Sequence, residues 1–274
     1  MNYIKKLIVK YSFKENKHTM SNTPSYFESP HTHRRLAYRY TPPTSKKLTI
    51  VYLYGFRSDM NGEKVYFLES LCNQEGLGFL TLDYSGHGVS SGAFEDGTIS
   101  QWLQDSLDLI DHITQGDIIL VGSSMGGWIA HLVALQRPNR IVGLIGIASA
   151  PDFTQELIWG NMTPSQKTKL MNEGQIIVAT EYNTQGWTIT KSLVEDGRKH
   201  LILGRPIPLS IPIRYLHGLK DISVPPIYSQ KLLDNVTSNN VTCTLIKSGD
   251  HRLSEEDNKH LLGAILLDLV QSSL

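Results

Sequence analysis

The chain has 274 residues, of which 40% are hydrophobic, so it is long enough to bury one substantial core. Lysine plus arginine balance aspartate plus glutamate at 26 each, which excludes a global field that would attract nucleic acid or an anionic membrane. The two cysteines, Cys72 and Cys243, are far apart and show no CxxC spacing, which argues against a disulfide framework or a zinc site. We therefore expect a single-domain protein of a reducing compartment with a small, roughly neutral partner.

Residues 1–34 are interpreted as an N-terminal extension, partly disordered, ahead of a domain that spans residues 35–274. The opening segment MNYIKKLIVKYSFKENKH is basic, but its apolar run LIV is too short for a secretion signal or a membrane-spanning helix. We therefore expect no transmembrane segment and a cytoplasmic protein. Two alternatives concern the same segment: a targeting sequence for the mitochondrial matrix, and a translation start at Met20 instead of Met1.

Apolar, β-rich segments alternate with helix-compatible segments along the rest of the chain. The predicted strands cover residues 48–55, 78–84, 117–122, 141–149, 211–218 and 241–247, with a further edge strand at 34–40. The predicted helices cover residues 62–75, 99–114, 125–136, 226–236 and 254–271. Because the strands are almost continuously hydrophobic, they are typical of a parallel sheet covered on both faces. The alternation predicts a three-layer α/β fold with right-handed crossovers.

One interval, between the predicted strands 141–149 and 211–218, is too long for a simple connection. It contains the helix-compatible segments SQKTKLMNE and TITKSLVEDGRKHL, with tryptophan and methionine scattered among polar residues. We interpret residues 153–208 as a helical cap over the carboxyl edge of the sheet, where open α/β sheets bind ligands.

Two segments match G-x-S-x-G, a pattern that can present a nucleophilic serine: GVSSG at Gly88–Gly92 and GSSMG at Gly122–Gly126. The chemistry requires a sharp strand-to-helix turn with small flanking residues. The strand DIILV leads into GSSMG, and the helix-forming GWIAHLVALQ follows it with a proline just beyond. GVSSG lies in a glycine-rich loop instead. We therefore predict Ser124 as the nucleophile and Ser90 and Ser91 as loop serines.

The predicted nucleophile needs a histidine base, which a carboxylate must hold in the right tautomer. In this kind of fold the acid and then the base follow the serine in the chain. His251 comes shortly after the last predicted strand, at the carboxyl edge of the sheet, and is predicted as the base. His217, at the end of an apolar strand, and His260, within the last predicted helix, are more typical of packing or solvent exposure.

Asp221 is the predicted acid, because it follows a strand by a short glycine-containing loop and precedes a new helix. Asp250 is an alternative, but a direct sequence neighbour of His251 can rarely turn its carboxylate toward Nδ1 of that ring. We interpret Asp250 as a loop-structuring residue. Asp152 is the stronger rival, because some members of this kind of fold place the acid just after that strand.

Attack on a carbonyl group produces an oxyanion that two backbone N–H groups must stabilise. The N–H of Met125, directly after the predicted nucleophile, is one candidate donor. The second donor should come from the loop after the strand LTIVYLYG, which makes the N–H of Phe56 the candidate. The Phe56 side chain is then either a wall of the acyl pocket or simple core packing.

Six segments together are more specific than the serine pattern: SDMNGEK, LDYSGHGVSSG, LVGSSMGGW, RPNRIVGLIGIASAPDFT, IPIRYLHGLKDISVP and SGDHRLSE. On these segments, from about Arg35 to the C-terminus, the chain resembles α/β-hydrolases of the abhydrolase domain-containing protein 10 type, mitochondrial palmitoyl-protein thioesterases, and their bacterial relatives. The resemblance implies the α/β-hydrolase fold, a triad of Ser124, Asp221 and His251, and hydrolysis of S-acyl thioesters and acyl-glucuronide esters. Tyr54 departs from the histidine of many hydrolases, with little expected consequence because backbone N–H groups bind the oxyanion.

We expect a serine hydrolase that cleaves acyl thioesters or esters through an acyl-enzyme, without a metal ion or an organic cofactor. A short-chain carboxylesterase or a peptidase is the first alternative, because the cap decides between an apolar acyl tunnel and polar anchoring groups. The second alternative is a non-catalytic ligand-binding protein that keeps the fold. Such proteins usually lose a triad member, whereas all three residue types are present here.

Overall fold

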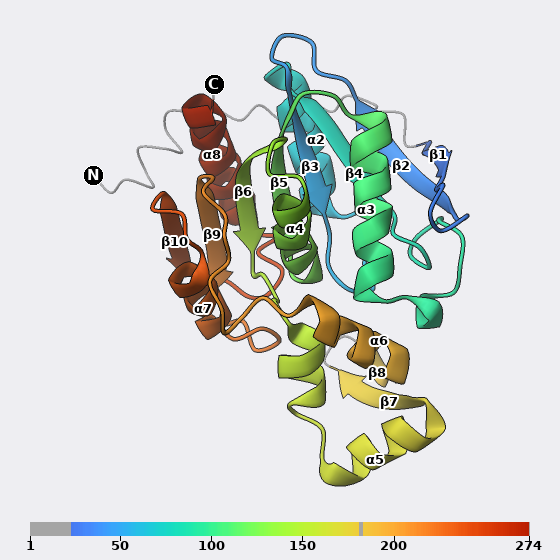
Figure 1. The fold of residues 1–274 in the computed structure, drawn as a ribbon. Helices are drawn as coiled ribbons and strands as arrows, with labels where there is room; N and C mark the ends of the chain where they lie inside the picture. Colours follow the sequence, from blue (N-terminus) through green and yellow to red (C-terminus); the bar gives the residue numbers. More distant parts are fainter. Residues whose placement is uncertain (1–22, 181–182, 274) are drawn as a thin grey trace.

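A mostly parallel sheet forms the centre of the protein, as the computed structural model shows for residues 23–180 and 183–273 (Figure 1). Its strands in these ranges are β1 (Ser25–Glu28), β2 (Arg35–Thr41), β3 (Leu48–Leu53), β4 (Gly78–Leu82), β5 (Asp117–Ser123), β6 (Ile141–Ile147), β9 (Ile213–Gly218) and β10 (Val241–Ile246). They lie in the order β1-β2-β4-β3-β5-β6-β9-β10. From β4 onward in this spatial order, neighbouring strands pair in parallel (β4, β3, β5, β6, β9 and β10). The pairs β1–β2 and β2–β4 are antiparallel.

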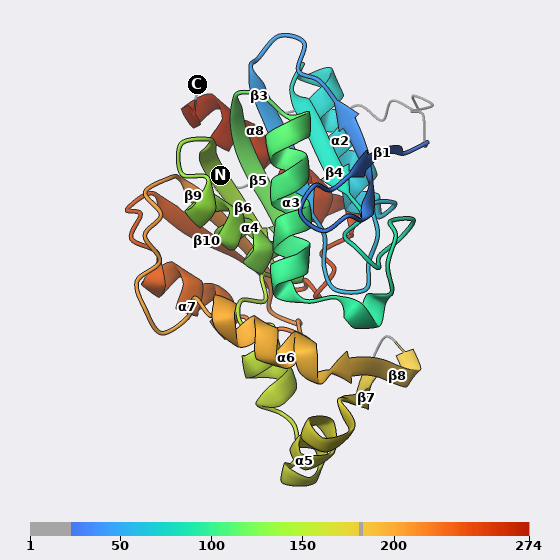
Figure 2. The same ribbon diagram turned by 45° about the vertical axis from the view of Figure 1, so that its right-hand side comes forward.

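Helices cover both faces of this sheet, which confirms the predicted three-layer architecture. They are α2 (Glu63–Gln74), α3 (Ile99–Ile113), α4 (Met125–Gln136), α7 (Ile227–Asn235) and α8 (Glu256–Ser273), with a 3₁₀ turn η1 (Phe94–Asp96) before α3. Helices α3, α4 and α7 cover one face, and α2 and α8 cover the other (Figures 1 and 2). The central strands β3 and β4 are therefore buried along their whole length, which explains their unbroken hydrophobicity.

The sheet begins earlier in the chain than predicted. Strand β1 lies inside the predicted extension 1–34 and pairs with β2, so β2 is the second strand of the sheet and not its edge. The sequence SYFE of β1 is largely exposed, so it carries no hydrophobic signal. The turn after β1 is fastened to α3, because the Ser29 hydroxyl and His31 Nδ1 both contact the carboxylate of Asp108. Residues 1–22, with the basic segment and Met20, lie outside the described residues.

Residues 154–200 form a separate layer beyond the carboxyl ends of the parallel strands (Figures 1 and 2), whereas residues 205–208, the end of the predicted cap, have already returned to the sheet domain, where Ile207 pairs with Val236. This segment contains a π-helical turn η2 (Thr154–Trp159), α5 (Pro164–Glu173), the strands β7 (Gln175–Thr180) and β8 (Asn183–Thr190), α6 (Lys191–Gly197) and a 3₁₀ turn η3 (Arg198–His200). The antiparallel pair β7–β8 was not predicted. Its second strand occupies the start of the predicted helix TITKSLVEDGRKHL, because α6 begins only where the Thr190 hydroxyl accepts a hydrogen bond from Leu193 N–H.

Two buried carboxylates connect this cap to the sheet domain. Asp196 of α6 accepts hydrogen bonds from the N–H of Ser100 (2.8 Å) and from its hydroxyl (2.7 Å), at the start of α3. Asp152, just after β6, accepts from the N–H groups of Ile202 and Leu203, each at 2.9 Å, where the chain returns from the cap. The cap is therefore held at both the entering and the leaving end.

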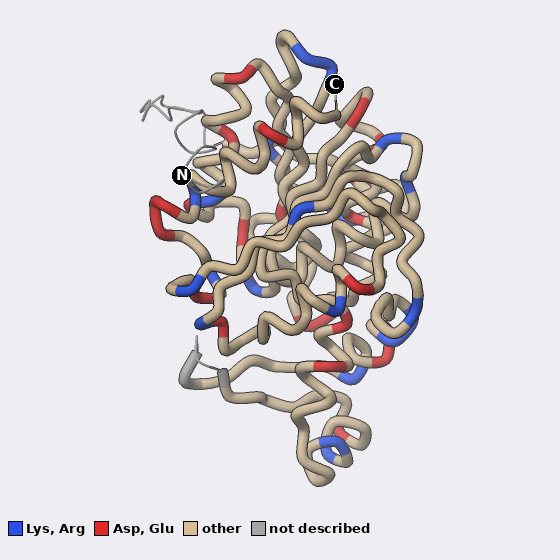
Figure 3. The backbone as a smooth tube through the Cα atoms, turned by 90° about the vertical axis from the view of Figure 1, so that its left-hand side faces the viewer, with Lys and Arg blue, Asp and Glu red and all other residues tan. Residues whose placement is uncertain are grey.

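Charged residues of both signs are distributed over the backbone without a block of one sign (Figure 3). This distribution agrees with the balanced composition. In the two described ranges, no helix is both long enough and apolar enough to span a bilayer.

Candidate active site

Ser124 stands at the turn between β5 and α4 with φ 53° and ψ −121°, a conformation that L-residues rarely adopt. Glycines make this turn possible. A Cβ atom on Gly122 would lie 2.3 Å from the Gly126 oxygen, and a Cβ atom on Gly126 would lie 2.0 Å from the Leu53 oxygen. Helix α4 can therefore approach β3 and β5 only because these positions have no side chain, and its N-terminus holds Ser124 at the sheet edge.

Three side chains that are distant in the sequence meet at this turn. The Nε2 atom of His251 lies 3.1 Å from Ser124 Oγ, and its Nδ1 atom lies 2.7 Å from Asp221 Oδ2. The loop after β10 carries His251, and the loop after β9 carries Asp221, so both come from the carboxyl edge of neighbouring parallel strands. The imidazole is 18% exposed and the carboxylate is fully buried.

The carboxylate of Asp221 is held by four donors. Its Oδ1 accepts from the N–H groups of Ser223 (3.0 Å) and Val224 (2.8 Å), and its Oδ2 accepts from His251 and from His217 Nε2 at 3.1 Å. Burial alone would raise the pKa of this carboxyl. The hydrogen bonds from the two histidines and from Val224 outweigh burial and lower the pKa to about 2. Asp221 is therefore ionised throughout the range in which a histidine base functions.

The sequence indicated only packing or solvent exposure for His217. In the structure, His217 Nε2 also contacts the Asp221 carboxylate. The side chain is buried, but both of its ring nitrogens have polar partners. The signal available in the sequence was the spacing of four residues in HGLKD, which brings the two side chains together around the end of β9.

The loop that follows β10 is fastened to α2. The Lys64 ammonium donates to the carbonyl of Arg252 and to the Ser254 hydroxyl at 3.2 Å. Burial lowers the pKa of Lys64 to about 8. Within the loop, Asp250 Oδ1 accepts from the N–H of Leu253 at 2.9 Å, so its carboxylate organises the loop.

The other candidate acid and base have different partners. Both carboxylate oxygens of Asp152 accept backbone N–H groups of the returning cap segment, and burial raises the pKa of this carboxyl. His260 lies on α8, with Nε2 3.6 Å from a carboxylate oxygen of Glu256. The geometry therefore joins Ser124 to His251 and Asp221 and leaves these two residues in other networks.

The serines of GVSSG fasten their loop to β2. The Ser90 hydroxyl donates to the Asp83 carbonyl at 2.6 Å and accepts from Ala37 N–H at 2.8 Å. The Ser91 hydroxyl accepts from Arg35 N–H at 2.9 Å. Neither arrangement involves a histidine.

The backbone at Gly55 and Phe56 runs directly past Ser124. A Cβ atom on Gly55 would lie 3.0 Å from Ser124 Cβ and 3.5 Å from Ser124 Oγ. Met125 is the first residue of α4. Both predicted N–H donors therefore belong to backbone that borders the serine side chain.

The loop with Phe56 is anchored on both sides. Asp83 Oδ1 accepts from the Tyr54 hydroxyl at 3.1 Å and from Met60 N–H at 2.8 Å. His87 Nε2 accepts from the N–H of Arg57 at 3.3 Å. Burial lowers the pKa of His87 to about 4, so its ring is neutral near pH 7 and keeps this acceptor.

An aromatic cluster surrounds the Phe56 side chain and joins the sheet domain to the cap. Its ring centroid lies 5.5 Å from that of Phe153 and 5.6 Å from that of Trp187 on β8. Phe94 and Trp102 contact the same ring from the other side, at 4.9 and 5.8 Å. Phe56 also packs against the apolar cluster inside the cap, which consists of Met162, Leu170, Ile176, Ile189 and Val194. The side chains around Phe56, next to the loop that borders Ser124, are therefore strongly apolar.

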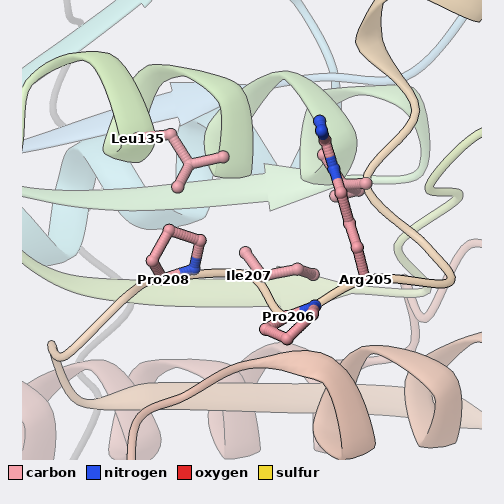
Figure 4. A pocket seen from close by; sticks show the side chains of 6 residues that line it. Leu135, Arg205, Pro206, Ile207 and Pro208 are labelled. Atoms are coloured by element: carbon pink, nitrogen blue, oxygen red, sulfur yellow. The ribbon is translucent and has the colours of Figure 1, made fainter.

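A cavity of about 320 Å³ lies elsewhere, lined by Leu135, Ile202, Arg205, Pro206, Ile207 and Pro208 (Figure 4). Leu135 is near the C-terminal end of α4, whereas Ser124 precedes its first residue, so roughly 16 Å of helix separates the two. In the parts of the chain that the structure describes, no three His, Cys, Asp or Glu side chains gather as metal ligands would.

Comparison with known proteins places the chain in a family. The family model described as serine aminopeptidase, S33, matches residues 45–196. The mitochondrial palmitoyl-protein thioesterase ABHD10 of Mus musculus is 36% identical over 222 residues, which cover 81% of this chain and 74% of that protein. The human ABHD10 is also 36% identical, over 81% of this chain and 72% of its own length.

Solved structures agree with this placement. Mouse alpha/beta hydrolase domain-containing protein 10 superposes with a TM-score of 0.84 at 33% identity, over 91% of this chain and 99% of that chain. An Agrobacterium vitis protein described as a hydrolase superposes with a TM-score of 0.85 at 34% identity, over 90% of this chain and 98% of that chain. The chain therefore belongs to the α/β-hydrolase family, and within it the chain resembles ABHD10.

Proposed function

We propose that the protein is a serine hydrolase that cleaves acyl thioesters or esters through an acyl-enzyme. The observation that carries this proposal is the continuous hydrogen-bonded chain from Ser124 Oγ through His251 to Asp221, at 3.1 and 2.7 Å. Because Asp221 binds Nδ1 of His251, the proton of a neutral ring lies on Nδ1 and the lone pair of Nε2 faces the serine hydroxyl.

Catalysis would begin when Ser124 Oγ attacks the acyl carbonyl carbon and His251 Nε2 takes the hydroxyl proton. The N–H groups of Phe56 and Met125 would donate to the oxyanion of the tetrahedral intermediate. Collapse would break the bond to the leaving thiol or alcohol, which takes the proton from His251. Water, deprotonated by the same ring, would then attack the acyl-enzyme and regenerate Ser124 with release of the carboxylic acid.

The aromatic cluster around Phe56 supports an apolar acyl group as the substrate. The ring lies next to the candidate oxyanion donor, and Phe153 and Trp187 extend the apolar surface toward the cap. A saturated chain needs such a surface and no polar partners. The relatives named palmitoyl-protein thioesterase ABHD10 point in the same direction, so we propose a long-chain acyl thioester as the preferred substrate.

A series of thioesters of one thiol, from acetyl to palmitoyl, tests this preference. We expect kcat/KM to rise with chain length, by up to about fourfold for each methylene that leaves water. Trp187→Ala is expected to lower kcat/KM about tenfold for the long chains and to change the acetyl substrate little, because only a long chain reaches β8. Ile177→Ala is the matched control, because Ile177 lies on the neighbouring strand of the same hairpin but is 66% exposed.

A flat or falling dependence on chain length would contradict the long-chain proposal and favour a short-chain carboxylesterase. The matching family is described as serine aminopeptidase, so peptide amides belong in the same assay. Faster turnover of a peptide amide than of any thioester would make a peptidase the better proposal.

The names of the ABHD10 relatives include the word mitochondrial. This supports the mitochondrial matrix over the cytoplasm as the proposed compartment. Expression with a fluorescent C-terminal tag tests it, and loss of an organellar signal on deletion of residues 1–22 would assign the targeting to that segment.

A further inference from the structure

A second histidine, His217, contacts the carboxylate that holds His251. It lies at the end of β9, and its side chain is completely buried. Its Nε2 atom is 3.1 Å from Asp221 Oδ2 and 2.8 Å from the carbonyl oxygen of Val224. Its Nδ1 atom is 2.6 Å from the hydroxyl oxygen of Ser229, which is buried on α7.

These partners determine where the proton of a neutral His217 ring lies. Nε2 faces two acceptors, a carboxylate and a carbonyl, so Nε2 carries the proton. Nδ1 is then an acceptor, and the Ser229 hydroxyl donates a hydrogen bond to it. In this tautomer the Nε2 proton of His217 faces both Asp221 and the Val224 carbonyl.

The hydrogen bond from His217 helps to fix the Asp221 carboxylate. Asp221 Oδ2 accepts from His217 and His251 together, whereas Oδ1 accepts from the backbone N–H groups of Ser223 and Val224. The bond from His217 therefore opposes rotation of the carboxylate about its Cβ–Cγ axis and keeps Oδ2 directed at His251.

We propose that His217 is a positioning residue for the reaction, which holds the Asp221 carboxylate in line with His251. It touches neither substrate nor reacting atoms and acts through Asp221 alone. This inference rests on the proposed function, because it assigns Asp221 and His251 their roles.

The test is a comparison of kcat and KM for the wild type, His217→Leu and His217→Gln, with rates per active site titrated by a fluorophosphonate. In His217→Leu, kcat is expected to fall about 10- to 100-fold because the carboxylate is no longer held in line, whereas KM is expected to change little. His217→Gln, whose amide N–H can reach Asp221, should recover most of the lost kcat.

Ser229→Ala is the second variant and removes only the hydroxyl that contacts Nδ1 of His217. It should lower kcat by a smaller factor than His217→Leu and leave KM unchanged. Wild-type kcat per titrated site in both His217→Leu and Ser229→Ala would overturn the inference. Ser124→Ala distinguishes failure of the proposed function from failure of the His217 proposal. If Ser124→Ala stays active, the proposed function fails. If Ser124→Ala is inactive but His217→Leu is unaffected, only the role of His217 is contradicted.

Discussion

Replacement of Ser124 by glycine is expected to abolish acyl hydrolysis, by at least ~10⁴-fold in kcat, and at the same time to stabilise the fold. Activity is lost because no hydroxyl remains to accept the acyl group. Stability is gained because Ser124 has φ 53°, which glycine adopts without strain. Ser124→Ala should be equally inactive but less stable than the glycine variant by about 1 kcal/mol, because alanine keeps the strained conformation.

Denaturant unfolding of both variants, with hydrolysis measured on the same samples, checks this pair of results. Ser91→Ala is the matched control, because Ser91 belongs to the other G-x-S-x-G segment and its hydroxyl only accepts a backbone N–H. It should keep wild-type activity. Residual turnover above about one per cent of wild type in the glycine variant would contradict the role of Ser124, and equal stability of the two variants would contradict the strain.

Replacement of Asp221 by asparagine should lower kcat about 10⁴-fold with little change in the fold, because an amide cannot hold His251 in the tautomer that leaves Nε2 free. Single-turnover acylation with a thioester measures this effect directly. A loss of less than tenfold would show that a different acid serves the histidine, and Asp152→Asn is then the variant to examine.

Asp221→Asn should also change how the unfolding free energy depends on pH in the acid range. Because the hydrogen bonds of Asp221 lower its pKa from its ordinary 3.8 to about 2 in the folded chain, the unfolded chain takes up a proton first as the pH falls. The carboxylate therefore stabilises the fold fully above about pH 4, by about 2 kcal/mol, and this contribution is lost as the pH falls toward 2. Between pH 5 and 2, Asp221→Asn should lose less unfolding free energy than the wild type by about that amount. Equal losses would contradict the lowered pKa.

The elements that position the site could be predicted because their causes are local. Apolar runs identified strands β3 to β6, β9 and β10, and glycines on both sides of Ser124 identified the turn into α4. Parallel strands end at one edge of a sheet, so residues that follow β9 and β10 must lie near a residue that follows β5. That topology is why Asp221 and His251 could be selected from many acids and histidines, although their catalytic roles remain predictions.

The missed features arise from contacts between distant segments. Strand β1 has no hydrophobic pattern and is ordered by pairing with β2 and by the contacts of Ser29 with α3. The hairpin β7–β8 has no clear hydrophobic pattern in the sequence, because only Ile176 and Ile189 among its described side chains are buried, whereas Ile177 is exposed. The partners of His217 lie on the acid loop and on α7, so the side chain looked like ordinary core in the sequence.

The partners of Asp152, the alternative catalytic acid, also could not be predicted from the sequence. Asp152 lies in the loop after β6 and fits the sequence criterion for a catalytic acid. Its carboxylate is instead occupied by the N–H groups of Ile202 and Leu203, which return from the cap after a long insertion. Only the path of the inserted segment determines whether such a carboxylate is free to hold a histidine.

Covalent trapping tests most directly whether Ser124 is activated by His251. The folded protein would be treated with a long-chain acyl fluorophosphonate, digested, and mapped by mass spectrometry, beside His251→Gln. We expect one adduct, on the peptide that contains Ser124, and labelling at least ~10³-fold slower in His251→Gln. No adduct on the folded wild type, an adduct on Ser90 or Ser91, or undiminished labelling of His251→Gln would contradict the proposed hydrolase.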